Sequence, residues 1–370
     1  MIASEIIKLL EDWSPPGAAW ERDNVGLQVG SRELKVSGVF LCLELNEKVL
    51  QQAIQKKCNF IFTHHPLIFN PLKKIDTSRD QKAVLIEKII KNNITVYSAH
   101  TNLDSTKGGV SFELAKTLKL KNIKFLELQS SNQYKVVVFA PEDYLEKLSG
   151  EVFSSGGGVI GEYDSCSFRL NGIGTFRGSE KANPSVGKKL KLEKVNEVRL
   201  EFIVDSWNLN KVLNAIIKTH PYEEPAFDVY PLKNRNVNYG AGAIGELEKE
   251  LNTQNFLGHV KKSLKADALK YCSGKKNKIK RVAVCGGSGS ELIESAIGNG
   301  ADAFVTADIK YHAFQDAENK ILLIDAGHYE TEIFSLNAVY TKLKDFISAK
   351  ENIKILKYTD TTNPVKFYKH

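Results

Sequence analysis

Imidazole groups recur just after apolar, strand-like runs of this 370-residue chain. His64 and His65 follow the run F-I-F-T, His100 follows T-V-Y-S-A, and His328 follows L-L-I-D-A-G. In an open parallel sheet, ligands collect at the carboxyl ends of the strands. We therefore expect these four histidines to meet at one edge of a sheet, where their nitrogens could bind a ligand or a metal ion.

Two of the histidine segments also carry a carboxylate. Asp104 stands four residues after His100, and Glu332 stands four residues after His328. If a helix begins at His328, this spacing stacks the imidazole and the carboxylate on one face, about one turn apart. Such a pair can coordinate a single metal ion.

The resulting ligand set is larger than one catalytic ion takes when it keeps an open position. It consists of three imidazoles and two carboxylates, from His64, His65, Asp104, His328 and Glu332. Because carboxylates can bridge, the set predicts two divalent ions, roughly 3.5 to 4 Å apart as in other two-metal sites. Without a cysteine, it suits zinc, iron, manganese or cobalt and does not choose among them.

A structural interpretation competes with the metal site. A lone histidine at a strand end is usually a hydrogen-bonded structural residue, and this applies to His100. The pair His64-His65 is different, because adjacent side chains converge only where the backbone leaves the extended form. Pro66 restricts His65 to extended conformations and would help to fix the direction of its imidazole.

Other residues are weaker candidates for substrate binding. Asp308 and His312 repeat the four-residue spacing after a strand and are expected to contact substrate or to support the ligands, unless Asp308 begins a helix. Ser288 lies in the turn C-G-G-S-G-S, whose amides could cradle a phosphate, with a tight structural turn as the alternative.

A glycine-rich and amide-rich segment lies near the start of the chain. Its sequence, D-N-V-G-L-Q-V-G, contains Asn24 and Gln28. These two amides could reach the cleft and bind substrate, or the segment could simply be a turn into a strand.

The elements that must position these residues form a predicted α/β fold with mostly parallel sheets. Strands alternate with helices at both ends of the chain, a pattern typical of parallel sheets covered on both faces. The middle has a β-α-β-β-α-β order, the ferredoxin-like arrangement, with a hairpin predicted to turn at Asn171-Gly172. We expect residues 129–235 to be a domain inserted between residues 1–128 and 236–370.

Composition limits the class of protein. Hydrophobic residues make up 42% and charged residues 26% of the chain, as in soluble globular proteins. The N-terminal segment lacks the basic start of a signal peptide, and no apolar run approaches the roughly 20 residues that cross a bilayer. Five cysteines without a C-x-x-C pair fit a reducing compartment, so we expect a cytoplasmic protein with no membrane partner. The net charge of +7 comes without an aromatic-basic module, which argues against nucleic-acid binding.

Six ordered motifs carry a family resemblance. D-N-V-G-L-Q-V-G, T-H-H-P-L-I-F, S-A-H-T-N-L-D, the G-S-G turn, T-A-D-I-K-Y-H and G-H-Y-E-T-E resemble those of the Nif-three-like proteins, whose bacterial members are often labelled GTP cyclohydrolase 1 type 2 homologs. The resemblance implies a dinuclear metal centre on the same five ligands and a homohexamer. The segment from His220 to Tyr230 is similar to the CutA-like, PII-like domain inserted in longer bacterial members. Two positions depart from the family pattern, namely Ala307 in place of glycine and Glu44 in place of the commoner aspartate.

Three functions fit these observations. The first is a metal-dependent hydrolase, in which His100 or a nearby carboxylate moves protons and, by the family label, the substrate is a nucleotide such as GTP. The second is a protein that binds iron or zinc reversibly for delivery. The third is a regulatory scaffold whose inserted domain senses a small molecule or binds a partner protein, with the metals in a structural role. The sequence does not discriminate among them, because a dinuclear site serves all three.

Overall fold

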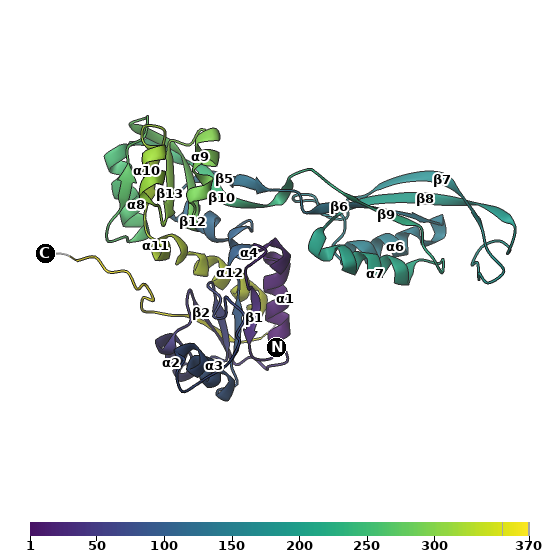
Figure 1. The fold of residues 1–370 in the computed structure, drawn as a ribbon, viewed down its shortest axis with the longest axis horizontal. Helices are drawn as coiled ribbons and strands as arrows, with labels where there is room; N and C mark the ends of the chain where they lie inside the picture. The colour runs from purple at the N-terminus through teal and green to yellow at the C-terminus, as the bar shows by residue number, and fades with distance from the viewer. Residues whose placement is uncertain (350, 369–370) are drawn as a thin grey trace. The chain divides into compact units, whose positions relative to one another are not determined.

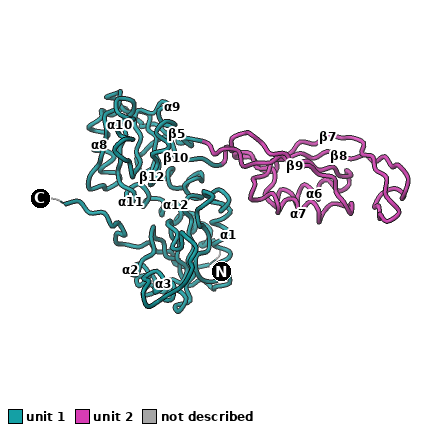
Figure 2. The backbone as a smooth tube through the Cα atoms, viewed as in Figure 1, with its two compact units in different colours: residues 1–127, 239–370 teal, residues 128–238 magenta. Residues whose placement is uncertain are grey.

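The computed structural model describes residues 1–349 and 351–368, and the chain divides into two compact units. Unit 1 is built from Met1–Glu127 and Tyr239–His370, and unit 2 from Leu128–Asn238, so unit 2 interrupts unit 1 in the sequence (Figure 2). Every described helix is too short or too polar to cross a lipid bilayer.

Unit 1 contains two sheets (Figure 1). The first has the strand order β1 (Gly26–Val29), β4 (Thr95–Ser98), β3 (Phe60–Thr63), β2 (Gly38–Cys42) and β15 (Lys354–Lys357). β4, β3, β2 and β15 are parallel, and β1 is antiparallel to β4. Each residue of β2, β3 and β4 is buried, as expected of parallel strands covered on both faces.

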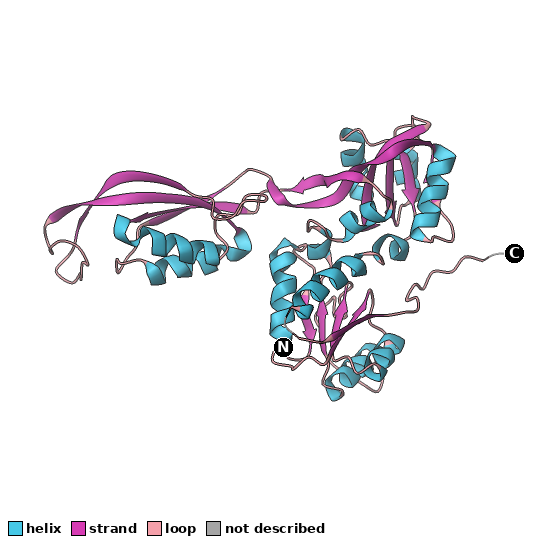
Figure 3. Cartoon of the chain, turned by 180° about the vertical axis from the view of Figure 1, so that it is seen from behind, coloured by secondary structure: helices cyan, strands magenta, loops and turns pink. Residues whose placement is uncertain are grey.

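Helices cover both faces of this first sheet (Figure 3). On one face α1 (Ala3–Trp13) and α12 (Ser335–Ser348) pack against alternate strand residues such as Phe60 and Phe62. On the other face α2 (Glu47–Gln55) and α3 (Gln81–Lys91) pack against Phe40 and Ile61. The alternation of side chains along each strand therefore gives both layers an apolar surface to bury.

The second sheet of unit 1 has six strands. Their order is β11 (Lys270–Cys272), β14 (Leu322–Asp325), β13 (Ala303–Ala307), β12 (Lys278–Ser288), β10 (Asn236–Asn252) and β5 (Lys121–Gln129). β12, β13 and β14 are parallel, whereas β10 and β11 are antiparallel to their neighbours β12 and β14. α5 (Val110–Thr117) and α8 (Thr253–Leu264) pack on one face, and α9 (Ile293–Gly298) and α10 (Tyr311–Ala317) pack on the other.

Two short helices begin where strands of the two sheets end. α4 (Thr101–Asp104) follows β4 of the first sheet, and α11 (His328–Glu332) follows β14 of the second. The predicted helix start at His328 is confirmed. A mixed α/β fold is thus present in unit 1, with an antiparallel strand at one edge of each sheet, β1 in the first and β11 in the second.

Unit 2 is a four-stranded sheet with two helices. The chain order is β6 (Gln133–Ala140), α6 (Glu142–Ser154), β7 (Phe168–Arg177), β8 (Leu192–Asp205), α7 (Leu209–Thr219) and β9 (Phe227–Pro231). In space the strands run β7-β8-β6-β9, with antiparallel pairing throughout. This is the predicted β-α-β-β-α-β order, and both helices pack on one face.

The predicted hairpin turn at Asn171-Gly172 is wrong. β7 runs straight through these residues, which pair with Val198 and Glu197 of β8, and the connection to β8 spans residues 178–191. Asn-Gly favours two-residue hairpin turns. Two residues further on, Gly174 makes room for a neighbour, because a Cβ on Gly174 would lie 2.0 Å from Glu197 Oε2.

Candidate metal centre

The five predicted ligands come together within unit 1. His64 and His65 follow β3, Asp104 ends α4, and His328 and Glu332 are the first and last residues of α11. The site thus draws on strand ends of both sheets. His64 is completely buried and Glu332 is 3% exposed, whereas His65, Asp104 and His328 are partly exposed.

The backbone turns at the histidine pair, as the convergence of adjacent side chains requires. The amides of both His64 and His65 donate to the carbonyl of Leu43, at 3.1 and 3.0 Å. Two successive amides on one acceptor are incompatible with a continuing strand. The imidazole centroids consequently lie 4.9 Å apart on the same side of the chain.

All the clustered histidines are anchored through Nδ1. His64 Nδ1 donates to the carbonyl of Ala99 at 2.8 Å, His65 Nδ1 lies 3.0 Å from Glu44 Oε1, and His328 Nδ1 lies 2.6 Å from Asp308 Oδ2. Because a carbonyl or carboxylate accepts, each Nδ1 carries a proton, and each Nε2 is the nitrogen left to bind a metal ion once any proton on it is released. Metal-binding histidines almost always show this arrangement.

The free Nε2 atoms surround Glu332. His65 Nε2 lies 3.0 Å from Oε2, His328 Nε2 lies 3.0 Å from Oε1, and His64 Nε2 lies 3.7 Å from Oε1. Ligand atoms at about 2.0–2.2 Å from a common ion are roughly 3 to 4 Å from one another. The spacing therefore suits metal coordination, with Glu332 placed between the imidazoles.

Three buried atoms of the cluster are left without hydrogen bonds, namely His64 Nε2, Asp104 Oδ1 and Glu332 Oε2. His64 Nε2 and Asp104 Oδ1 face one another at 3.7 Å, too far for a hydrogen bond, and neither has another partner among the described residues. Orphaned buried polar atoms are rare in folded proteins and usually have a partner such as a water molecule or an ion. A divalent cation would satisfy His64 Nε2 and Asp104 Oδ1, so the residues fit a metal ion.

The electrostatics of the cluster also call for positive charge. Burial would raise the pKa of Glu332, but His64, His328 and His65 hold it well below its usual range. Burial opposes protonation of His65, yet Glu332 and Glu44 raise the pKa of this imidazole to about 10. Protons thus balance the carboxylates in the absence of cations, and bound metal ions would replace those protons.

His100 belongs to the same cluster. Its ligand nitrogen lies within 4.8 Å of those of His64 and His65, and its Nδ1 lies 2.9 Å from Oδ2 of Asp23. Asp23 is nearly buried and also accepts from the amide and hydroxyl of Thr101. Burial would raise the pKa of Asp23, but His100 and Thr101 lower it to about 2. Asp23 therefore remains ionised and directs His100 Nε2 toward the centre.

The weaker candidates take different places. Asp308 contacts His328 and lies outside α10, with φ of +57°, so it does not begin that helix. His312 is exposed and its Nδ1 lies 3.1 Å from Gln315 Oε1. Ser288 is the exposed last residue of β12. Beside it, Gly287 has φ of +62°, and a Cβ there would lie 2.3 Å from Glu332 Oε1. The glycine turn thus lets the backbone approach the cluster.

Asn24 and Gln28 connect β1 to the loop that follows β3. Asn24 Nδ2 donates to the carbonyl of Ile68, and Gln28 Oε1 accepts from the amide of the same residue. Their contact with a substrate stays a prediction. Both amides have a structural role, since they hold the loop that directly follows the histidine pair.

Asp23 and Glu44 are functional candidates that sequence reasoning missed. Asp23 precedes Asn24 in the glycine-rich segment, and Glu44 follows β2, the strand next to β3. Glu44 could have been found from its position, because it follows a parallel strand that neighbours the strand before the histidine pair. The sequence holds no comparable signal for Asp23, which reaches His100 across 77 residues.

Comparisons with known proteins agree with the fold. Residues 1–364 match the family model described as Duf34/NIF3 (NGG1p interacting factor 3). The chain is 38% identical over 367 residues to a Bacillus subtilis protein and 37% over 365 residues to one from Halalkalibacterium halodurans, each named GTP cyclohydrolase 1 type 2 homolog, with 98% of both chains covered in each case. A Bacillus cereus structure titled as a protein related to NIF3 is similar with a TM-score of 0.84 and 38% identity, covering 100% of this chain and 99% of that one. The chain therefore belongs to the DUF34/NIF3 family.

Proposed function

We propose that this protein is a dinuclear metal-binding protein that acts as a metal-dependent hydrolase. The observation that carries the proposal is the common orientation of the imidazoles, with every Nδ1 anchored and every Nε2 facing the buried carboxylate of Glu332. The residues that would hold two divalent ions, zinc or iron first and manganese or cobalt as alternatives, are His64, His65, Asp104, His328 and Glu332.

When bound, such ions lower the pKa of a water molecule toward neutrality and polarise the bond that is attacked. The protein's own residues contribute orientation and charge. Glu332 sits between His65 and His328 at 3.0 Å from each, which suits a bridging role. Asp104, whose pKa burial raises to about 6, lies on the His64 side.

His100 is the residue we assign to proton transfer. Asp23 binds its Nδ1 and leaves Nε2 free to accept a proton from an attacking water. The ionised carboxylate of Asp23 would then stabilise the imidazolium that forms. This is the carboxylate–histidine arrangement by which many hydrolases fix the tautomer of a general base.

The proposed substrate class is a nucleotide, with GTP as the first to test. This part rests on the names of the relatives, GTP cyclohydrolase 1 type 2 homolog. Asp308, His312, Ser288, Asn24 and Gln28 remain proposed substrate contacts. Of these, Asn24, Ser288, Asp308 and His312 are exposed.

The assembly and the inserted unit complete the proposal. We assign unit 2 to the CutA-like, PII-like kind on its β-α-β-β-α-β order, and we propose a cytoplasmic homohexamer on the family resemblance. Neither assignment affects the chemistry of the metal centre.

A turnover experiment tests the hydrolase proposal. The metal-loaded wild type and a His65→Ala variant are compared for turnover of GTP, other nucleotides and phosphoesters, with metal content measured in parallel. The proposal predicts turnover by the wild type and a loss of at least a hundredfold in the variant. Equal turnover in both would refute it, and two bound metals without turnover of any substrate would favour metal delivery instead.

A further inference from the structure

A cavity of about 470 Å³ lies beside the proposed metal centre, and all of its wall belongs to unit 1. The wall includes His328, a proposed ligand, and also Asp308 and Glu44, whose carboxylates contact the Nδ1 atoms of His328 and His65. The volume falls within the roughly 300–1,000 Å³ of small-molecule sites. A molecule in this cavity would therefore touch the residues that orient the centre.

The C-terminal segment of the chain forms one side of this cavity. Residues 358–368, here called the C-terminal strap, follow β15 of the first sheet. The hydroxyl of Thr362 donates to Glu44, and Asn363 Nδ2 donates to Glu330 Oε1 at 2.9 Å. Glu330 belongs to α11, the helix that carries two of the proposed ligands. Two side-chain contacts thus hold the strap where its following residues complete the wall.

Apolar side chains line the cavity and are incompletely covered. Val365 and Phe367 of the strap are 59% and 44% exposed, although they belong to the wall. Leu269 and the ring of Tyr329 line the same cavity. A planar ring placed among these side chains would remove apolar surface from water, which favours its binding.

The charged side chains of the wall are mostly acidic. Its carboxylates are those of Glu44, Asp308, Asp325 and Glu330, and its one lysine, Lys270, has its Nζ 2.7 Å from Asp325 Oδ2. Carboxylates outnumber cations among these described residues even when the imidazole of the wall is protonated. Because an ionised carboxylate only accepts hydrogen bonds, the wall suits a ligand group that donates them and disfavours a phosphate.

Asp308 offers an acceptor at the side of the cavity next to the centre. Its Oδ2 accepts from His328 Nδ1 at 2.6 Å, whereas no described residue donates to its Oδ1. Its side chain is 53% exposed, and its φ of +57° lies in the left-handed region that non-glycine residues rarely adopt. Backbone strain of this kind clusters at functional sites. One carboxylate oxygen thus holds His328, and the other is available to a ligand.

We propose that this cavity binds the base of the nucleotide substrate and selects a base whose outer edge carries N–H donors. Guanine fits best, because its N1–H and the amino group on C2 are adjacent donors that can pair with one carboxylate. Uracil fits poorly, because its N3–H lies between two carbonyl oxygens, which the carboxylates repel. The inference rests on the proposed function for the nucleotide and adds the part of the substrate that the cavity recognises.

Titration with nucleosides tests this assignment without turnover and without a phosphate that metal ions would attract. Guanosine, 1-methylguanosine and uridine are titrated calorimetrically into the zinc-loaded, full-length protein. Guanosine should bind one per chain and at least tenfold more tightly than either of the other two. 1-Methylguanosine is the matched probe, because it keeps the purine ring and replaces the N1 donor by a methyl group, which leaves a carboxylate unpaired.

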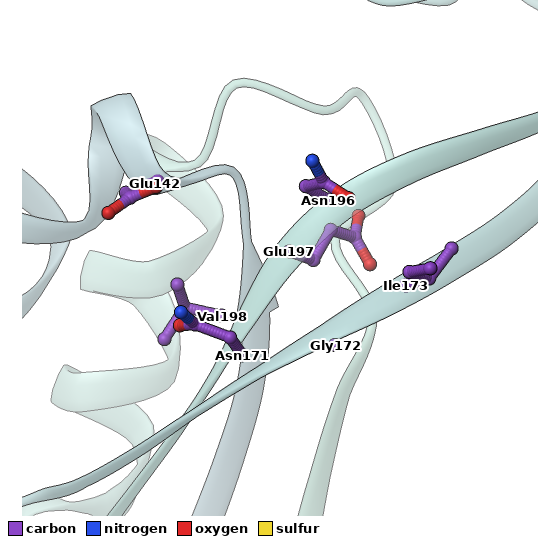
Figure 4. A pocket seen from close by; sticks show the side chains of 7 residues that line it. All are labelled: Glu142, Asn171, Gly172, Ile173, Asn196, Glu197 and Val198. Atoms are coloured by element: carbon purple, nitrogen blue, oxygen red, sulfur yellow. The ribbon is translucent and has the colours of Figure 1, made fainter.

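Variants locate the binding. Asp308→Asn keeps an acceptor for His328 but turns an amide donor toward the cavity, so it should lower the preference for guanosine over uridine at least tenfold. A merely structural loss would weaken both nucleosides alike. Phe367→Ala removes a ring of the strap and should weaken guanosine binding about tenfold without loss of bound zinc. Glu142→Gln is the control, because Glu142 of α6 lines a separate cavity of about 370 Å³ in unit 2 (Figure 4).

Several results would overturn the proposal. Absence of guanosine binding would do so, and so would equal affinities for guanosine and uridine or for guanosine and 1-methylguanosine. An unchanged preference in Asp308→Asn, or equal losses in Phe367→Ala and Glu142→Gln, would also contradict it. Selective guanosine binding without turnover of any nucleotide would refute the hydrolase proposal alone. Bound zinc and the midpoint of thermal unfolding are measured for each variant, which separates lost metal and lost folding from lost recognition.

Discussion

Removal of the Glu44 carboxylate should weaken metal binding although Glu44 is not a proposed ligand. Glu44 Oε1 lies 3.0 Å from His65 Nδ1, and its other oxygen accepts from the hydroxyl of Thr362. A hydrogen bond to a charged group contributes about 1.5–3 kcal/mol, and Glu44 is 36% exposed, which favours the lower end. About 1.5 kcal/mol corresponds to roughly tenfold in affinity. Loss of such supporting partners typically costs about 10–100-fold.

The assay is a competition between the protein and a chromogenic chelator for zinc. Glu44→Ala should bind zinc about 10- to 30-fold more weakly than the wild type, whereas Glu44→Gln keeps an acceptor for His65 and should lose only a few fold. Glu47→Gln is the control, because Glu47 of α2 pairs with Lys88 of α3 and neither is a proposed ligand. A change below threefold in Glu44→Ala, or an equal change in Glu47→Gln, would refute the supporting role of Glu44.

Two further changes test the glycine turn and the inserted unit. Gly287→Ala should destabilise the protein by about 1 kcal/mol and reduce zinc affinity at least tenfold. The reason is that φ of Gly287 is +62° and the new Cβ would lie 2.3 Å from Glu332 Oε1. Gly258→Ala in α8 is the control and should leave zinc affinity unchanged, because the space around Gly258 is open. In unit 2, His220 Nε2 donates to the carbonyl of Phe139, and His220 Nδ1 accepts from the amide of Tyr222. Burial lowers the pKa of His220 and outweighs the Phe139 carbonyl and Glu197, which both raise it. Neutral His220 therefore contributes its full stability above the unfolded pKa of about 6.5, and this contribution is lost as the pH falls from that value through the lower folded pKa. The midpoint temperature of thermal unfolding should consequently depend more steeply on pH between about 7 and 5 in the wild type than in His220→Asn. Equal slopes would contradict this.

The clustering of the five proposed ligands could be predicted because strand ends and helical spacing are local features. An apolar run locates the strand before His64, and a four-residue spacing locates Glu332 relative to His328. The topology of a parallel sheet then brings such positions together without further information. At Glu44, which departs from the family pattern, the structure shows that the carboxylate reaches His65.

The sequence could not predict features that depend on nonlocal contacts. Asp23 contacts His100 although the two residues are 77 positions apart in the sequence, and no periodic pattern links them. The Asn171-Gly172 prediction failed because local turn propensity was outweighed by pairing along the whole length of β7 with β8. A cavity of about 780 Å³ in unit 2 is lined by residues from β6, β7, β8 and the loop before β9, a combination visible only in three dimensions.

The central claim is that two divalent ions share Glu332 within this cluster. Its most direct test is the metal content of the protein after zinc loading and exhaustive dialysis, measured by inductively coupled plasma mass spectrometry for the wild type and Glu332→Ala. The account predicts two ions per wild-type chain and fewer than one in the variant, because Glu332 lies 3.0 Å from the nitrogens of both His65 and His328. Fewer than one ion per wild-type chain, or two ions in both proteins, would contradict it.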